Sequence, residues 1–216
     1  WFLRDDVVRL VESVQREAIP DIMRVFGHDG LYLRPSSAVS ATLSGNLLAN
    51  VLSLHRNGTG WSGELRCADA ALPLLPASQS LVFAAFVLES SDQPSALITE
   101  LARVLKPEGV LLLLTLSPWS PLRLSWGGTS LRVRGARDWA TQLHGAGLEV
   151  ERQRPMGPYW LPGDGAATLA EEHGGWIDGM RAARLSIARR REGGVTPLRW
   201  SAPAMGMSQN AGLGST

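Results

Sequence analysis

Side chains that could serve as nucleophiles or metal ligands are few along these 216 residues, and their spacing argues against a metal centre. Cys67 is the only cysteine, which excludes an internal disulfide and a multi-cysteine zinc site. Its place in a predicted strand favours a small buried apolar side chain over a nucleophile. The four histidines show no metal-ligand spacing, so each is expected on the surface or in a loop: His28, His55, His144 and His173. The residues alone therefore name no metal ligand and no catalytic group.

The charge of the chain is nearly balanced, at +1, and its basic residues are unusual because Lys106 is the only lysine among 21. The arginine bias suits phosphate recognition, and it equally suits a GC-rich genome. The run Arg189 to Arg191 could bind RNA phosphates or could be the solvated end of a strand. Because no strong positive field surrounds the chain, nucleic acid is not the expected partner.

The stretch "RVLKPEGVLLLLTLSPWS", residues 103–120, shows which elements must position any site. Six of the seven residues from Val110 to Leu116 are aliphatic, too few to span a bilayer, which needs about 20. The run lacks two-residue alternation, so it predicts a strand buried on both faces, as in parallel sheets. Leu97, Leu101 and Val104 before it predict a helix, which Pro107 and Gly109 end. Helix, turn and buried strand are typical of half a βαβ unit.

Further elements follow the same reasoning from hydrophobic periodicity and turn residues. A helix is expected over residues 3–25, with a break at Pro20, and another from residue 135 to about 147. Strands are expected within 30–39, 50–60, 63–76, 80–90 and 110–116, then at 148–154 and 180–191. This order predicts an α/β fold: a mainly parallel, doubly wound (Rossmann-like) seven-stranded sheet with helices on both faces and one antiparallel edge strand. Ligands of such sheets bind beyond the carboxyl ends of the strands.

The length of the chain suits one domain, which we expect to span residues 1–199. It would begin with a helical segment at 1–29 and carry an irregular insertion rich in Gly and Pro at 155–180. Residues 200–216 are small and polar, so a disordered tail is expected. The chain opens without a signal-peptide pattern and carries one cysteine, which favours a cytoplasmic protein.

Tryptophan is concentrated on segments expected to emerge near the carboxyl edge of the sheet or in the insertion. These side chains could line an apolar substrate pocket, or they could cover an exposed edge of the sheet. The residues concerned are Trp119, Trp126, Trp160 and Trp176.

Residues 67–120 resemble the second half of class I S-adenosylmethionine-dependent methyltransferases, in particular the small bacterial type 11 group. "SPWS" at 117–120 also looks like the "NPWS" that follows the fifth strand in one branch of that group. The combination is specific although each piece alone is weak. The matching residues are Ala68-Asp69, Leu72-Pro73, Val87-Leu88-Glu89, Asp92, Pro94, Glu100 and Arg103 to Gly109.

The resemblance implies S-adenosylmethionine as the cofactor and suggests which residues would contact it. Asp69 would accept a hydrogen bond from the adenine amino group, with the Ala70 backbone beside it. The alternative is that Asp69 only caps a loop. The full set of implied cofactor contacts is Arg34, Ser36, Asp69, Ala70, Ala84 and Ala85.

The first half of the chain departs from the family pattern. A nucleotide site of this kind needs a glycine-rich turn after the first strand, but "LYLRPSSAVSATLSG" has no glycine before Gly45. The family's ribose-binding acid also has no match, because His55, Arg56 and Asn57 stand there. Losing such a charge-assisted hydrogen bond costs about 1.5–3 kcal/mol. Phe86 stands where this branch often has a polar residue, so the motif supplies no general base.

Two functions remain open. The first is an S-adenosylmethionine-dependent methyltransferase of unknown small-molecule or macromolecular substrate, with a degenerate cofactor loop. The second is a catalytically inactive methyltransferase-like protein that acts as a binding or regulatory partner, which would imply a protein partner. An RNA-directed role is a weaker third, because the near-neutral charge argues against it.

Overall fold

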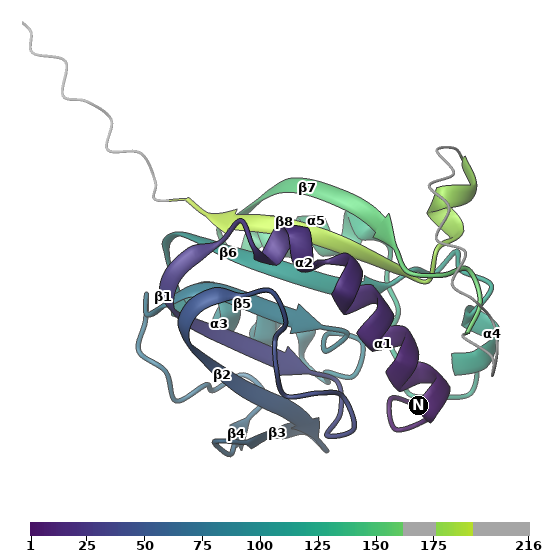
Figure 1. Ribbon diagram of the computed structural model, residues 1–216, viewed down its shortest axis with the longest axis horizontal. Coiled ribbons are helices and arrows are strands. Elements are labelled where there is room, and N and C mark those ends of the chain that lie inside the picture. Colours follow the sequence, from purple (N-terminus) through teal and green to yellow (C-terminus); the bar gives the residue numbers. More distant parts are fainter. Residues whose placement is uncertain (162–175, 192–216) are drawn as a thin grey trace, which may run out of the picture.

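Eight strands form one mixed sheet in the computed structural model, which describes residues 1–161 and 176–191 (Figure 1). The strand order is β4-β3-β2-β1-β5-β6-β8-β7, and β2, β1, β5 and β6 run parallel to one another. The bounds are β1 Phe26–Arg34, β2 Leu47–Asn57, β3 Gly60–Gly63, β4 Cys67–Ala68, β5 Gln79–Ala85, β6 Leu105–Leu116, β7 Leu148–Met156 and β8 Ala183–Arg190.

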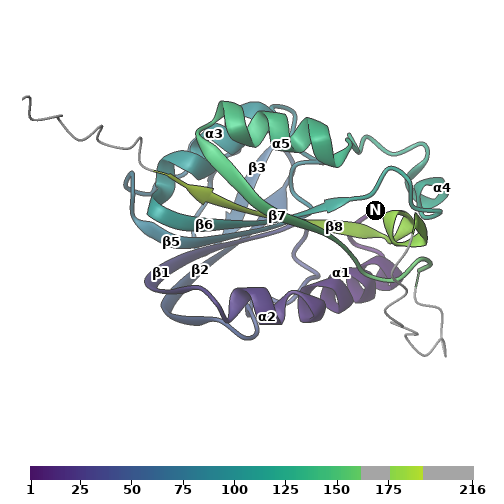
Figure 2. The same ribbon diagram turned by 90° about the horizontal axis from the view of Figure 1, so that it is seen from above.

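Helices cover both faces of this sheet, as Figure 2 shows edge-on. On one face lie α1 (Asp5–Glu17) and α2 (Ile19–Ile22), and on the other lie α3 (Pro94–Val104) and α5 (Ala136–Gly145). A short helix, α4 (Arg123–Trp126), follows β6, and a 3-10 helix, η1 (Trp176–Met180), precedes β8. The predicted doubly wound α/β class is confirmed.

The aliphatic run of β6 is buried because it faces two hydrophobic cores at once. Leu112 and Leu114 pack in the core beneath α1, whereas Leu111 and Leu113 pack in the core beneath α3 and α5. Successive side chains of a strand point to opposite faces, so a strand covered on both sides has no polar positions to alternate with. The central strand predicted at 110–116 is therefore confirmed.

Helix α1 also follows the sequence pattern, because its buried stripe contains Val7, Leu10, Val11 and Val14. The helix breaks at Ala18, and Pro20 stands in the first turn of α2, where its missing N–H removes no helical hydrogen bond. The break predicted at Pro20 is thus found two residues earlier.

Several details of the sheet differ from the prediction of seven strands with one antiparallel edge strand. The sheet has eight strands within the described residues, and β3 runs antiparallel to its neighbours β2 and β4, as β8 does to β6 and β7. Gly58, with φ of +57°, allows a tight turn after β2, so the chain folds straight back into β3. Strand β8 lies inside the sheet, between β6 and β7, where Leu185 and Ala188 are buried.

The connection from β1 to β2 is a second difference of consequence. Residues 35–46 contain no helix, and the parallel partners β1 and β2 are joined by this 12-residue loop alone. Val39 and Leu43 of the loop are buried in the core beneath α1 and fill part of the space between loop and sheet.

Some elements begin or end at other residues than predicted, and two predicted segments lie outside the described residues. The strand predicted within 30–39 begins at Phe26 and ends at Arg34. Pro155 and Met156, predicted in the insertion, belong to β7. Residues 162–175 of the insertion and the predicted tail 200–216 lie outside the described residues.

Candidate functional site

A buried ion pair joins Arg56 and Asp69 near the carboxyl end of β2. Arg56 Nη1 lies 2.6 Å from Asp69 Oδ1, and the two side chains are only 6% and 14% exposed. The second guanidinium nitrogen of Arg56 donates to the carbonyl of Val87 at 3.0 Å, and the guanidinium lies 4.3 Å from the ring centre of Trp61. Arg56 is therefore held by charge, by a hydrogen bond and by a cation–π contact.

Both carboxylate oxygens and the backbone carbonyl of Asp69 accept hydrogen bonds from other residues of the chain. Ser91 Oγ donates to Oδ2 at 2.5 Å, and Trp61 Nε1 donates to the backbone carbonyl at 3.1 Å. Ala70 is half-buried, and together with Asp69 and Thr59 it lines a small cavity of about 330 Å³. The residue expected to receive the adenine amino group is thus already a hydrogen-bond acceptor for Arg56 and Ser91.

At the end of β1, Arg34 and Ser36 are also tied to the chain itself. The Arg34 guanidinium is buried and donates to the carbonyl of Val39, and desolvation lowers the pKa of this group. Ser36 Oγ donates to the carbonyl of Phe2 at 2.7 Å. These contacts fasten the β1–β2 connection to itself and to the residues before α1, instead of presenting free donors to a ligand.

Phe86 directly follows β5 and has φ of +51°, a left-handed conformation that is rare for a bulky residue. Its N–H donates to the carbonyl of Leu114 at 2.9 Å, and its ring centre lies 6.1 Å from that of Phe2. Ala84 and Ala85, just before it, are fully buried in the two opposite cores. Apolar packing therefore occupies the carboxyl end of β5.

Glu89 is a buried acid to which the sequence assigned no role beyond its place in the motif. Its Oε1 accepts a hydrogen bond from the Leu116 N–H at 2.6 Å, whereas Oε2 has no partner among the described residues. Burial raises the pKa of Glu89 to about 7. A neutral carboxyl avoids the large cost of burying an isolated charge.

These residues do not fit the usual cradle for a nucleotide cofactor. Such a cradle needs a backbone that approaches the ligand closely and a helix N-terminus that faces it. In the described chain, the loop after β1 has no glycine before Gly45 and leads into no helix. Arg56 stands where the family's ribose-binding acid is expected, and it occupies the carboxylate of Asp69.

The remaining sequence expectations can be placed in the structure. Cys67 is half-buried against the core beneath α3, and burial raises the pKa of its thiol, which favours the neutral form. Trp126 is buried and packs edge-to-face against Trp1, with 5.5 Å between the two ring centres, whereas Trp119 and Trp160 are exposed. Within the described residues there is no group of three or more potential metal ligands. No described helix is long and apolar enough to cross a membrane.

Comparison with known proteins identifies the fold. The family model described as "Methyltransferase domain" matches residues 15–113. No curated protein matches the chain. The structure is similar to that of a Haloferax volcanii complex between the Trm112 methyltransferase activator and a putative methyltransferase, at 16% identity and a TM-score of 0.63. That match covers 88% of this chain and 96% of the other.

Two further solved structures are similar. One is a SAM-dependent methyltransferase from Aquifex aeolicus, at 15% identity and a TM-score of 0.54, with 86% of this chain and 94% of that chain covered. The other is the [4+2]-cyclase SpnF, at 16% identity and a TM-score of 0.52, with 87% and 82% covered.

The family match and these neighbours confirm the resemblance to class I S-adenosylmethionine-dependent methyltransferases and imply S-adenosylmethionine as the cofactor of this fold. The cofactor contacts suggested from the sequence stay predictions. Arg56 departs from the family pattern in the sequence, but its ion pair with Asp69 is visible only in the structure. The signal for it was a basic residue in place of an acid.

Proposed function

We propose that this protein, whose chain has the methyltransferase fold, acts by binding a partner and does not transfer methyl groups. The observation that carries the proposal is the Arg56–Asp69 ion pair. A cofactor that used Asp69 in the usual way would compete with Arg56 for the carboxylate. Removing a partner from a buried pair costs about 3–5 kcal/mol, which corresponds to roughly two to three and a half decades of affinity.

The comparisons support a protein as the partner. The Haloferax volcanii neighbour is a complex with a methyltransferase activator, so a chain of this fold binds another protein there. The neighbour SpnF is called a cyclase, which illustrates that the fold is not tied to one activity. Neither likeness extends a named partner or reaction to this chain.

A second candidate function is favoured by one specific observation. The cavity of about 330 Å³ beside Asp69 and Ala70 lies where the sequence resemblance expects the adenine ring. Residual binding of S-adenosylmethionine in that cavity would still allow the protein to transfer methyl groups. This is the methyltransferase with a degenerate cofactor loop that the sequence suggested first.

Isothermal titration calorimetry separates the two functions. Purified protein is titrated with S-adenosylmethionine and, separately, with S-adenosylhomocysteine, after a cooperative thermal transition has shown that it is folded. The proposal expects no binding heat at millimolar ligand for the natural chain and for Asp69→Ala. Micromolar binding that Asp69→Ala weakens at least tenfold would contradict our proposal and favour the methyltransferase with a degenerate cofactor loop.

A further inference from the structure

A larger cavity lies at the amino ends of the parallel strands, at the opposite end of the sheet from the Arg56–Asp69 pair. Its volume is about 560 Å³, within the range of roughly 300–1,000 Å³ typical of small-molecule sites. Its lining residues come from the start of β1, from the turn before the buried part of β6, and from the two strands β7 and β8. The seven residues of β5 separate the two ends by about 20 Å.

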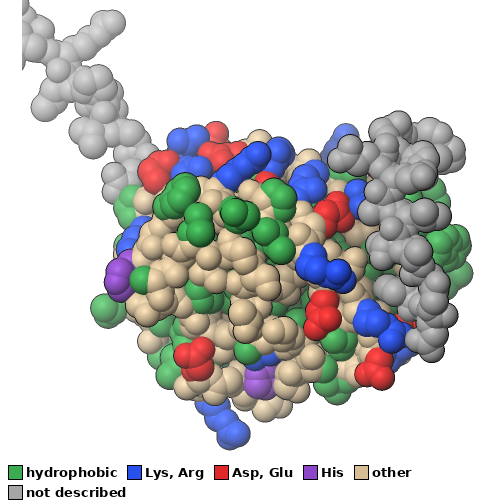
Figure 3. All heavy atoms as spheres, viewed as in Figure 1, with side chains coloured by type: hydrophobic (Ala, Val, Ile, Leu, Met, Phe, Trp, Pro, Cys, Tyr) green, Lys and Arg blue, Asp and Glu red, His purple; other side chains and the backbone are tan. Residues whose placement is uncertain are grey.

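The floor and rim of this cavity are apolar. Val110 and Leu112 of β6 and Ile187 of β8 belong to the floor, and Phe26 stands at the rim with 73% of its surface exposed. Seen from the side of α1, hydrophobic side chains gather beside basic and acidic ones on the part of this face that α1 leaves uncovered (Figure 3). An exposed phenylalanine next to an apolar floor provides a surface on which a flat ligand can stack.

Lys106 gives the cavity a positive charge that the protein does not neutralise by an ion pair. Its Nζ lies 3.4 Å from Ser80 Oγ, and no ion pair joins it to a carboxylate of the described residues. Hydrogen bonds from His28 and Asn50 lower the pKa of Asp29, and the charge of Lys106 contributes to this shift. Arg24 adds a second cation at the wall, 71% exposed and 3.8 Å from Asp21. The ammonium, the guanidinium and the hydroxyl can all donate to a bound anion.

The carboxylates around the cavity are engaged elsewhere. Asp21 accepts hydrogen bonds from Arg152 and from Arg154, the latter at 2.7 Å. Glu151 pairs with Arg189 at 2.8 Å, and Glu108 lies 3.5 Å from Arg191. None of these acids therefore forms an ion pair with Lys106.

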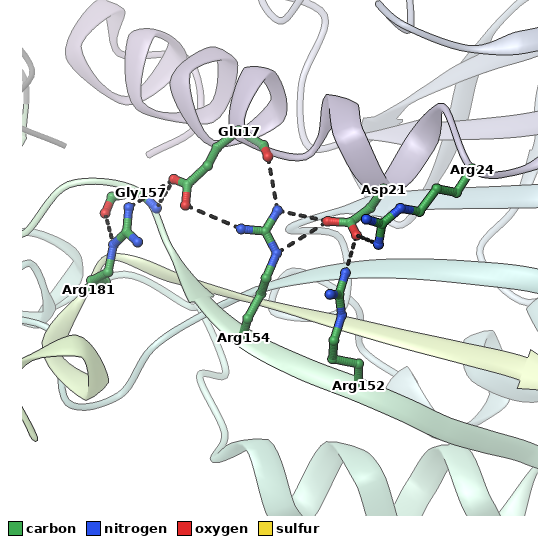
Figure 4. A network of polar contacts seen from close by, with 7 residues as sticks. All are labelled: Glu17, Asp21, Arg24, Arg152, Arg154, Gly157 and Arg181. Carbon is green, nitrogen blue, oxygen red and sulfur yellow. Dashed lines mark hydrogen bonds and ion pairs between the residues drawn. The ribbon is translucent and has the colours of Figure 1, made fainter. Parts of the chain in front are cut away.

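A network of arginines holds the helical wall of the cavity in place. Figure 4 shows Glu17 and Asp21 on the helical side facing guanidinium groups from the strand side. Glu17 Oε2 lies 3.0 Å from Arg181 and also accepts the Gly157 N–H at 2.8 Å. Two carboxylates meet four guanidiniums in this network: Glu17 and Asp21 against Arg24, Arg152, Arg154 and Arg181. Of these residues Asp21, Arg24 and Arg152 line the cavity, so they give it one net positive charge.

We propose that this cavity binds a phosphate monoester that carries a flat apolar body. The phosphate contacts Lys106 and Ser80, with Arg24 nearby, and the apolar body lies over Val110 and Ile187 against Phe26. Two cations and a hydroxyl suit a dianion with several acceptor oxygens, and the apolar floor favours a ligand with an apolar body over inorganic phosphate alone. The inference does not depend on the proposed function, because the cavity lies at the other end of the sheet.

Fluorescence titration with 1-naphthyl phosphate tests the proposal, with inorganic phosphate and 1-naphthol titrated as the two halves of that probe. We expect 1-naphthyl phosphate to bind with one site per chain and at least tenfold more tightly than either half. Equal affinity for 1-naphthol and 1-naphthyl phosphate would show that the phosphate group does not contribute to binding, and the proposal would be wrong.

Matched variants locate the site. Lys106→Gln should weaken 1-naphthyl phosphate at least fivefold, and Phe26→Ala should weaken it by a similar factor without the loss of charge. Arg137→Gln removes one exposed positive charge from α5 on the opposite face and should leave the affinity unchanged. Unchanged binding in Lys106→Gln, or an equal loss in Arg137→Gln, contradicts the proposal.

Chemical shifts in the natural chain provide a readout that does not depend on folded variants. The amides of Gly109 and Ile187, which line the cavity, should shift on titration with 1-naphthyl phosphate, while those of Asp69 and Ala70 should not. The reverse pattern would assign the ligand to the other end of the sheet and overturn the inference.

Discussion

The guanidinium of Arg56 lies 2.6 Å from the carboxylate of Asp69, in a site where the family resemblance expects an acid for ribose and a free acid for adenine. One substitution, a basic residue near the end of β2, thus changes both expected roles. It removes the first acid and engages the second. The methyltransferase fold is retained around a carboxylate that Arg56 and Ser91 already bind.

Loss of the Arg56 guanidinium should destabilise the fold. Arg56→Met leaves the Asp69 carboxylate with Ser91 as its remaining side-chain partner, so we expect a loss of about 3 kcal/mol in the free energy of unfolding. Urea unfolding measures this. Arg191→Met is the control, because its pairs with Glu149, Glu108 and Glu151 lie at the surface and should each contribute less than about 1 kcal/mol. Similar losses in both variants would contradict the importance of burial.

Stability should fall as the pH rises through neutrality because of Glu89. The folded protein raises the pKa of this carboxyl from 4.5 to about 7, so the folded state holds the proton more tightly than the unfolded state does. The contribution is complete below about pH 4.5 and is lost as the pH passes 7, for a total of about 3 kcal/mol.

The measurement is the free energy of unfolding at pH 5 and at pH 8.5, for the natural chain and for Glu89→Gln. The variant carries a neutral amide in place of the neutral acid, so its stability should decrease less between the two pH values. If the two proteins show the same pH dependence, Glu89 does not titrate in this range.

Close packing between β1 and β5 should make Gly27 intolerant of a side chain. A Cβ at this position would lie 2.3 Å from Ser80 Cβ, so Gly27→Ala should cost about 2 kcal/mol through overpacking. Ser80→Gly in the same chain removes the clashing atoms and should recover part of the loss. Thermal unfolding of the two single variants and the double variant measures the coupling, and additive losses would rule out the clash.

Asp21 should be the residue that holds α2 against β7. Asp21→Asn keeps the shape of the side chain but weakens the hydrogen bonds from Arg152 and Arg154, so we expect a loss of about 2 kcal/mol. Asp138→Asn is the matched control, because among the described residues that exposed carboxylate accepts a hydrogen bond only from the Gly135 N–H at the start of α5. Urea unfolding should show a smaller loss there, of about 0.5 kcal/mol.

The sequence by itself determined the parts of the molecule whose signals are local. The apolar run at 110–116 predicted the central strand, and the stripe through Val7, Leu10 and Val14 predicted α1, because burial imposes a period on neighbouring residues. The doubly wound class followed from the order of such elements. The missing glycines after β1 were visible too, because glycine is a residue type and not a contact.

The tertiary structure alone decided what lies beside what. Asp69 appeared from the sequence as a residue for a cofactor, but its partner is Arg56 on β2, and the antiparallel pairs β2–β3 and β3–β4 bring the two together. The neutral state of Glu89 depends on burial from all sides, and the cavity at Lys106 depends on five strands and α2. Charge pairing and desolvation depend on distances through space, and a linear pattern does not carry those distances.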